Sequence, residues 1–177
     1  MAMQCSSFRH MNIRVGNGYD THPLVKGRPF ILGGVNIPSD LGIKGHSDGD
    51  ALIHSIMDSL LGSLSKKDIG YYFPSNSEEF KNIKSSQLLC KVDKIIKEQG
   101  YKILNIDSTV ILEYPHIGKY TDLMVKNISK TLKLELNQVS VKATTNDGLG
   151  FIGERKGISV ITMKKLIVLI LLSNHGL

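Results

Sequence analysis

Asp20 and His22 are separated by one threonine in the segment GNGYDTHP, residues 16–23. On an extended strand, positions i and i+2 point to the same face, so both side chains can reach one ligand. A carboxylate oxygen and an imidazole nitrogen are both donors that hold zinc. We expect Gly16 and Gly18 to let the chain turn tightly there and present both side chains. Taken alone, the segment is more typical of an Asx turn with a surface histidine than of a metal site.

A second group of candidate ligands lies in GHSDGDALIH, residues 45–54. His46 precedes a predicted helix, and His54 lies on its second turn. Ser47 and Asp48 stand at the helix start, where free N–H groups and the helix dipole favour anions. His54 has apolar neighbours, which is typical of a core histidine without a ligand. Together with the upstream Asp–His pair it would instead form a three-ligand zinc site whose fourth position is open for catalysis.

Asp58 follows His54 by four residues. Positions i and i+4 are neighbours on a helix surface. A metal-bound histidine usually donates its other ring N–H to a carboxylate, a carbonyl or water. We therefore expect Asp58 to accept that hydrogen bond.

The third group lies in KATTNDGLGFIGERKG, residues 142–157. Thr144 and Thr145 end a predicted strand and offer hydroxyl groups. Asp147 could bind a hard cation such as Mg²⁺, which combines one or two carboxylates with substrate phosphates. The glycines of this segment would let the backbone approach a ligand closely. An ordinary loop between strands is the alternative, because the segment lacks the P-loop pattern.

The hydrophobic periodicity predicts which elements carry these groups. We expect a strand over 12–19, two short strands around a GG kink in 30–40, and a helix within 45–64 that starts at Ser47, Asp48 or Asp50 and ends near Gly62. A loop at 68–80 leads to a helix over 85–100, capped by Ser85 or Ser86 and closed by Gly100. Strand 101–114, helix 120–134, strand 138–145, a glycine-rich loop and strand 158–172 follow. This order predicts an α+β fold with helices on one face of a mixed sheet.

Composition limits the class of protein. The chain has 177 residues, a hydrophobic content of 41% and a net charge of +6, which favours anionic ligands such as phosphorylated small molecules. It has no tryptophan and no arginine-rich stripe, so we expect no nucleic-acid partner. The longest apolar run, residues 166–172, is far shorter than the roughly 20 residues that cross a bilayer, so we expect no membrane partner. We expect one catalytic domain over residues 12–173, with residues 1–11 disordered, as a cloning remnant or the trimmed end of a precursor.

Five segments, in this order, resemble the 2-C-methyl-D-erythritol 2,4-cyclodiphosphate synthases of the non-mevalonate isoprenoid pathway. They are RVGNGYDTHP, LGGVNIP, HSDGDALIHSIMDSLLG, DIGYYFP and VKATTNDGLGFIGE. The resemblance covers nearly all of residues 13–171. It implies a homotrimer with active sites between neighbouring subunits, and zinc held by Asp20, His22 and His54. It also implies a second divalent cation, Mg²⁺ or Mn²⁺, near Asp147, where the family has a glutamate.

The implied substrate is a cytidine diphosphate ester, 4-diphosphocytidyl-2-C-methyl-D-erythritol 2-phosphate. Its 2-phosphate would attack the β-phosphorus, so that CMP leaves and a cyclic diphosphate forms. His46 and Thr145 match positions that stabilise the transition state. The matching segments assign substrate contacts to Asp20, His22, His46, Ser47, Asp68, Ile69, Gly70, Phe73, Pro74, Ser75, Asn76, Ser77, Leu112, Pro115, His116, Ile117, Gly118, Thr144, Thr145, Asn146, Asp147 and Phe151.

Three positions depart from the family pattern. Ser75 replaces an aspartate, and His116 stands where a lysine is common. Glu154 replaces the arginine of the bacterial pattern and is followed by Arg155, to which we assign a structural role. This variant resembles plastid-type members, so we expect a plastid location, in an apicoplast or chloroplast stroma, ahead of a bacterial cytoplasm.

Two other functions fit the same residues. The first is a metal-dependent phosphohydrolase in which the zinc ion activates water. The second is a non-enzymatic trimer that binds an isoprenoid diphosphate along its axis and uses zinc only as a structural ion.

Overall fold

The structure is a computed structural model that describes residues 13–168. The expected remnant, residues 1–11, and residues 12 and 169–173 of the expected domain lie outside the described residues. The elements are β1 (Ile13–Val25), β2 (Ile31–Leu32), β3 (Val35–Asn36), β4 (Gly42–Ile43), α1 (Ala51–Ser63), α2 (Ile69–Tyr72), η1 (Glu78–Phe80), α3 (Ser85–Glu98), β5 (Tyr101–Ile111), η2 (Gly118–Tyr120), α4 (Thr121–Leu132), η3 (Leu136–Gln138), β6 (Val139–Thr144), α5 (Gly150–Gly153) and β7 (Gly157–Val168).

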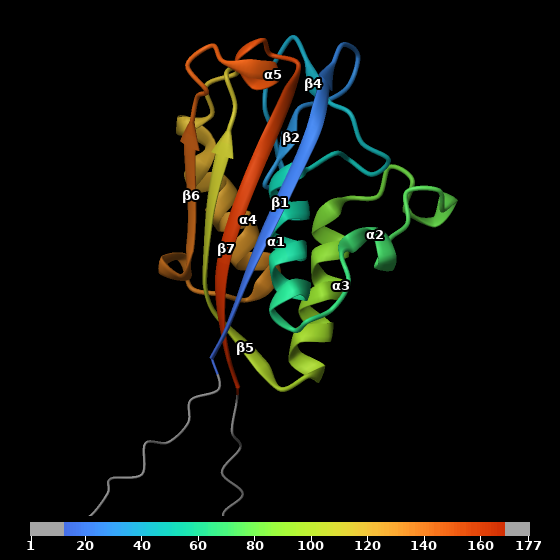
Figure 1. The fold of residues 1–177 in the computed structure, drawn as a ribbon, viewed down its shortest axis with the longest axis vertical. Helices are drawn as coiled ribbons and strands as arrows, with labels where there is room; N and C mark the ends of the chain where they lie inside the picture. The colour runs from blue at the N-terminus through green and yellow to red at the C-terminus, as the bar shows by residue number, and fades with distance from the viewer. Residues whose placement is uncertain (1–12, 169–177) are drawn as a thin grey trace, which may run out of the picture.

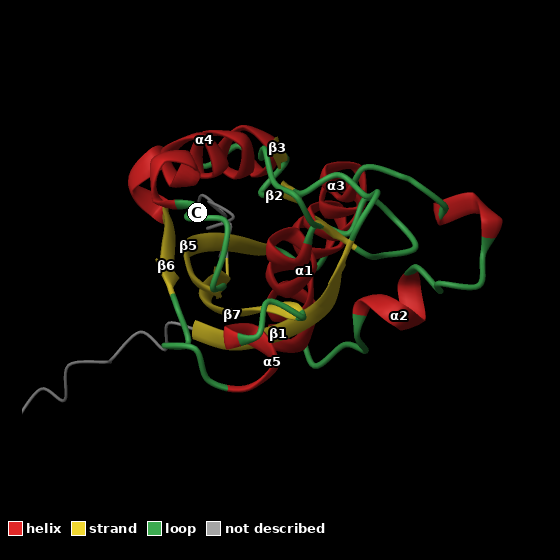
Figure 2. Cartoon of the chain, turned by 90° about the horizontal axis from the view of Figure 1, so that it is seen from above, coloured by secondary structure: helices red, strands yellow, loops and turns green. Residues whose placement is uncertain are grey.

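A five-stranded sheet forms the centre of the fold, in the order β4-β1-β7-β5-β6. β7 is antiparallel to both β1 and β5, whereas β5 and β6 are parallel, so the sheet is mixed as predicted. The three long helices α1, α3 and α4 cover one face of the curled sheet, and Figure 2 shows them on its inner side. The α+β class and the single layer of helices are therefore confirmed.

The core lies between this face and the helices. α1 is buried along most of its length, including Leu52, Ile56 and Leu60. α3 adds Leu89 and Ile96, which recur at helical spacing. Burying aliphatic side chains of this kind contributes about 1.5–3 kcal/mol each. Because α1 lies directly over β1 and β7 (Figure 1), this packing fixes the helix that carries His54 against the strand that carries Asp20.

Some local predictions are wrong and others are confirmed. β1 continues through the Asp–His segment to Val25, so no turn interrupts it there. Asp50, one of the three expected caps, does cap α1, because its side chain accepts a hydrogen bond from the N–H of Ile53, and the helix ends at Ser63, one residue after the expected Gly62. Ser85 is the first residue of α3 rather than its cap. The expected loops at 68–80 and 146–157 contain the short helices α2 and α5. Gly100 does follow α3, with a φ of 75°.

Candidate active site

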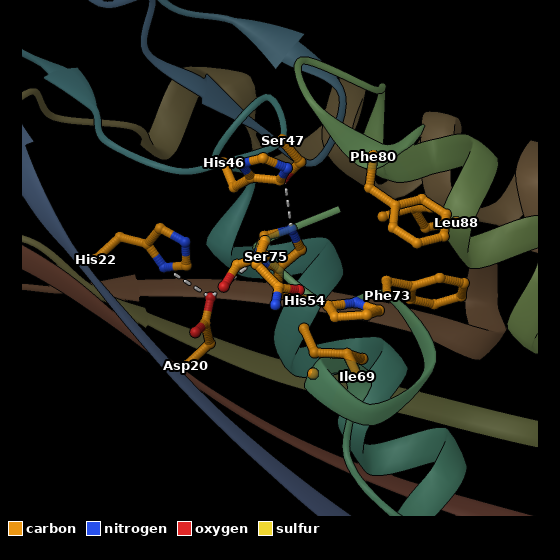
Figure 3. A pocket seen from close by; sticks show the side chains of 13 residues that line it. Asp20, His22, His46, Ser47, His54, Ile69, Phe73, Ser75, Phe80 and Leu88 are labelled. Carbon is orange, nitrogen blue, oxygen red and sulfur yellow. Dashed lines mark hydrogen bonds and ion pairs between the residues drawn. The ribbon is translucent and has the colours of Figure 1, made fainter. Parts of the chain in front are cut away.

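Asp20, His22 and His54 converge at one point. The first two lie on β1 and the third on α1, and one ligand atom from each lies within 4.8 Å of the others. The Oδ2 atom of Asp20 is 2.9 Å from Nδ1 of His22 and 3.4 Å from Nδ1 of His54 (Figure 3). Yet Asp20 Oδ2 and His22 Nδ1 are buried and have no hydrogen-bond partner among the described residues. Buried ligand atoms that lack a hydrogen-bond partner and face a common point are suited to bind a metal ion. Two imidazole nitrogens and one carboxylate oxygen suit a divalent ion.

Two glycines bring α1 close enough to β1 for this convergence. A Cβ atom at Gly18 would lie 2.0 Å from the carbonyl oxygen of Ser55, and one at Gly16 would lie 2.1 Å from that of Ser59. The Ser55 hydroxyl in turn donates to the carbonyl oxygen of Gly18 at 3.1 Å. The expected role of these glycines in a tight turn was therefore wrong. They remove side chains from the interface where the helix backbone meets the strand.

The second nitrogen of the His54 ring points away from this cluster. Its Nε2 atom lies 3.2 Å from Oγ of Ser47 and 3.0 Å from Oγ of Ser85. The expected hydrogen bond to Asp58 is not found among the described residues, because the Oδ1 atom of Asp58 accepts from the N–H of Ile69 at 2.8 Å. Helical side chains lean toward the helix N-terminus, so the His54 ring extends toward the preceding loop and away from Asp58. Local spacing gave no signal for Ser85.

Burial and charge set the protonation states of the cluster. Burial favours a raised pKa for Asp20, but the two imidazoles outweigh it and lower that pKa to about 2. For His54, burial acts to lower the pKa, yet the neighbouring Asp20 carboxylate raises it above its usual value. Burial raises the pKa of Asp58. Asp20 is therefore ionised at neutral pH, as a metal-binding carboxylate must be.

The cluster lies at the wall of a pocket of about 500 Å³. Eleven of the residues assigned to substrate or metal by sequence line it, together with Phe80 and Leu88: Asp20, His22, His46, Ser47, His54, Ile69, Gly70, Phe73, Pro74, Ser75 and Asn76. Figure 3 shows the apolar side chains on the side opposite His22. Sequence reasoning missed Phe80 and Leu88, since nothing separates them from ordinary core positions.

Two further predicted residues, Ser77 and Asp68, do not line this pocket but contact segments that do. The carbonyl oxygen of Ser77 lies 2.8 Å from Nε2 of His46 and holds that ring in place. Asp68 caps α2, where its side chain accepts from the N–H of Tyr71 at 3.0 Å. Its carboxylate is exposed, which leaves its remaining acceptor positions open to a ligand.

The other predicted residues gather at a different place. Leu112, Pro115, His116, Ile117, Gly118, Thr144 and Thr145 line a separate cavity of about 220 Å³ with Ala143. Thr145 donates to Asp147 at 3.3 Å, and the Glu113 carboxylate accepts from the N–H groups of Asn146 and Gly148. This cavity lies at the β5–β6 side of the sheet, whereas the metal cluster lies on β1, with β7 between them. The described chain therefore does not bring Thr145 and His54 into one pocket.

Phe151 and Arg155 belong to neither of these two cavities. Phe151 lines a third hollow with the Thr21–Pro23 segment. Arg155 forms an ion pair with Asp40 at 2.7 Å, and its guanidinium lies 4.5 Å from the ring centroid of Tyr114. Both of these contacts of Arg155 are made within the described chain, which is compatible with the structural role expected of it.

Known proteins resemble this chain over the same residues that build the fold and the site. The model of the YgbB family matches residues 13–167, which is most of the chain. The chain belongs to the YgbB family. A curated YgbB relative from Clostridium botulinum strain Hall, named 2-C-methyl-D-erythritol 2,4-cyclodiphosphate synthase, is 53% identical over 147 residues. That match covers 83% of this chain and 95% of the relative. A second, from Desulfatibacillum aliphaticivorans, carries the same name at 51% identity, with the same 83% and 95% coverage.

Solved structures agree with this YgbB assignment. The IspF–CDP complex from Plasmodium falciparum superposes with a TM-score of 0.77 at 38% identity, covering 88% of this chain and 96% of that one. The bifunctional IspDF of Campylobacter jejuni gives 0.87 at 38% identity and covers 90% of this chain, which spans only 43% of the bifunctional one.

The two curated relatives are bacterial and give no support to the expected plastid location. Within residues 13–168, no helix is long and apolar enough to span a bilayer.

Proposed function

We propose that this chain is a 2-C-methyl-D-erythritol 2,4-cyclodiphosphate synthase, which converts 4-diphosphocytidyl-2-C-methyl-D-erythritol 2-phosphate to the cyclic diphosphate and CMP. The observation that carries the proposal is the Asp20–His22–His54 cluster at the wall of a large pocket, in a chain whose curated YgbB relatives bear this name. Oxygen of the 2-phosphate forms a new bond to the β-phosphorus. The bond from that phosphorus to the bridging oxygen breaks, and CMP leaves with the electron pair.

The three ligands would hold one zinc ion, which supplies Lewis-acid neutralisation of phosphate oxygens that otherwise repel each other. A second divalent cation, Mg²⁺ or Mn²⁺, would be held near Asp147. The chain itself supplies positioning and a polar environment, which dominate phosphoryl transfer. Ser47 lies at the pocket wall and offers its hydroxyl group to phosphate oxygens as charge develops, and the His46 ring, held through Nε2 by the Ser77 carbonyl, lies at the same wall next to the site of that charge. No protein nucleophile is required, since the attacking group is part of the substrate.

The rest of the pocket fixes the substrate. The N-terminal turn of α2, with Asp68 and Gly70, presents acceptors and backbone to the sugar hydroxyl groups. Phe73 and Ile69 provide an apolar wall that displaces water from the reacting phosphates. The backbone of residues 112–118 would face the cytosine, and the hydroxyl of Thr145 would stabilise the transferring phosphate.

We further propose that the active form is a homotrimer whose active sites combine two chains. The separation of the metal pocket on β1 from the cavity near β6 supports this assembly, because a second chain could bring its Thr145 cavity to the His54 pocket. The sheet face away from the helices also exposes large apolar side chains suited to burial against other chains. They are Ile13, Val15, Tyr19, Ile161 and Met163.

The direct test is to incubate the purified protein with the cytidylyl substrate, Zn²⁺ and Mg²⁺, and to follow the products by ³¹P NMR. We expect stoichiometric CMP and cyclic diphosphate. Linear phosphate products would replace this proposal with the phosphohydrolase. Light scattering should give a mass about three times the 19.5 kDa of one chain.

A further inference from the structure

The hydrogen bonds around His54 reach beyond the metal cluster to a third element, α3. Nε2 of His54 lies 3.0 Å from the hydroxyl oxygen of Ser85, the first residue of that helix. The same hydroxyl donates to Oδ1 of Asp48 at 2.5 Å. Ser85 is fully buried and His54 is 8% exposed, so bulk water cannot substitute for these contacts. The three side chains form a continuous chain from the metal cluster to Asp48.

The donors and acceptors between Asp48 and His54 follow from the hydrogen-bonding capacity of each group. An ionised carboxylate only accepts hydrogen bonds, and Asp48 receives three: from the Ser85 hydroxyl, from the Ser85 N–H at 2.9 Å and from the Asp50 N–H at 3.3 Å. The single hydroxyl proton of Ser85 is therefore used by Asp48. Toward His54, the Ser85 oxygen can only accept, so the 3.0 Å hydrogen bond between them requires the proton on Nε2, and the Ser47 oxygen at 3.2 Å can accept from the same N–H.

A neutral imidazole with its proton on Nε2 has a bare lone pair on Nδ1. Nδ1 is the atom of His54 that faces Asp20 Oδ2 at 3.4 Å. We propose that Ser85 and Asp48 are positioning residues that lock His54 in the Nε2–H tautomer and so present its Nδ1 lone pair to the metal ion. This inference rests on the proposed metal-dependent function and adds two residues to it. They act through His54 and do not touch the substrate.

A purely structural role for the same residues makes a different prediction. Asp48 also satisfies the N-terminal N–H of α3, where Lys84, the cap residue, makes no side-chain hydrogen bond. Ser85→Ala separates the two roles, because it keeps the backbone N–H and removes only the hydroxyl. Ser86→Ala is the matched control, since this neighbour is also in the first turn and lies on the side of a different cavity, with Lys130 and Thr131.

The test is metal affinity, measured by competition for Zn²⁺ with a chromophoric chelator. We expect Ser85→Ala to weaken Zn²⁺ binding by about 10–100-fold, the usual effect of removing a hydrogen-bond partner of a ligating histidine. Thermal unfolding of the metal-free Ser85→Ala protein should change little, and Ser86→Ala should bind zinc like the parent. Equal zinc affinity in a folded Ser85→Ala protein would overturn the proposal.

A measurement on the unmutated protein keeps the proposal testable if Ser85→Ala does not fold. In ¹⁵N-histidine-labelled, zinc-loaded protein, the ring of His54 should show its proton on Nε2 and the metal on Nδ1. The opposite assignment, with the proton on Nδ1, refutes the positioning role. A failure of the proposed function would give a different result. If the protein binds zinc through the Nε2–H tautomer of His54 but releases no CMP, the positioning role stands and the synthase activity is refuted.

Discussion

Asp20 Oδ2 lies 2.9 Å from His22 Nδ1, within ion-pair distance, and yet neither atom has an aligned hydrogen-bond partner among the described residues and both are buried. Two polar atoms placed this close without a hydrogen bond cost free energy unless a third partner satisfies both. A metal ion is such a partner, and Nδ1 of His54 on α1 faces the same point. The ligand geometry is thus built into the packing of α1 on β1.

Replacing Asp20 by asparagine should remove zinc binding and activity together. An amide oxygen is a neutral and weak zinc ligand, so we expect zinc affinity and kcat/KM to fall by about 100-fold or more. Metal content by mass spectrometry and CMP release measure the two effects. The circular dichroism spectrum and the oligomer mass should stay unchanged. A variant that loses its fold on losing zinc would instead support the trimer with a structural ion.

Two inactive variants should restore activity when they are mixed into one oligomer. Asp20→Asn removes the metal pocket of its own chain, and Thr145→Ala damages the cavity near β6. If each active site combines two different chains, a mixed trimer contains some sites with neither substitution. Random 1:1 mixing should restore about a quarter of the parent activity, since two independent choices must both be intact.

The mixed trimers are made by unfolding the two variants together and reassembling them. As the control, each variant is unfolded and reassembled alone by this procedure. Neither self-mixed sample should recover activity. A 1:1 mixture that stays as inactive as its components would contradict a site shared between chains and require both residues to act within one chain.

The residues of the metal cluster could be predicted because their relation is mostly local. Asp20 and His22 share a strand face by their spacing, and His54 follows from a short helical motif. Asp58 also fits the i, i+4 rule, but the lean of helical side chains directs His54 elsewhere. Ser85 is 31 positions from His54. Only the packing of α1 against α3 brings them together, and no sequence period reports such a contact.

The same distinction explains which helix cap is used and why the role expected for the glycines was wrong. Ser47, Asp48 and Asp50 are equally good caps by residue type. Asp50 caps α1 because it is fully buried and also accepts from the N–H groups of Gly33 and Gly34 at 2.9 and 2.7 Å. Gly18 suggested a turn, whereas tertiary packing uses it for close approach of a helix. Local sequence patterns predict where the helices and strands lie. Which role a residue such as Asp50 or Gly18 takes depends on contacts with residues far away in the sequence.

Gly18→Ala should therefore damage the metal site from a distance. Its Cβ atom would meet the backbone of Ser55 at 2.0 Å, which cannot move without shifting α1 and His54. We expect a loss of about 1–3 kcal/mol in the free energy of unfolding, as overpacking usually costs, and weaker zinc binding. Gly62→Ala is the matched control, because its nearest neighbour would lie 3.7 Å away. Alanine there should stabilise α1 by about 0.5–1 kcal/mol. Chemical denaturation measures both.

Asp58→Ala should affect substrate binding and leave the metal intact. Asp58 accepts from the N–H of Ile69, which starts α2 at the pocket wall. Leaving that N–H without a partner costs about 1–3 kcal/mol and loosens α2. We expect a several-fold higher KM with unchanged zinc affinity, by steady-state kinetics and chelator competition. Asp58→Asn keeps an acceptor oxygen and should behave like the parent. A loss of zinc in Asp58→Ala would return Asp58 to the role expected from sequence.

Lys164 should make stability depend on pH. It is 2% exposed, and its Nζ atom has no hydrogen-bond partner among the described residues. Burial lowers its pKa from 10.5 to about 7. Below about pH 7 the lysine is charged in both the folded and the unfolded chain, and the free-energy cost of burying that charge lowers the stability of the folded chain by its full amount. Between about pH 7 and 10.5 the unfolded chain binds more protons, so stability rises with pH.

Lys164→Met should flatten this rise and raise the stability near pH 7 by a few kcal/mol, since it keeps the volume and removes the charge. The measurement is denaturant unfolding of the metal-free protein across this pH range. Lys165→Met, at the more exposed neighbouring position, should leave the pH dependence as in the parent. Parallel curves for Lys164→Met and the parent would mean that Lys164 keeps its proton when folded, so that its burial does not control the pH dependence.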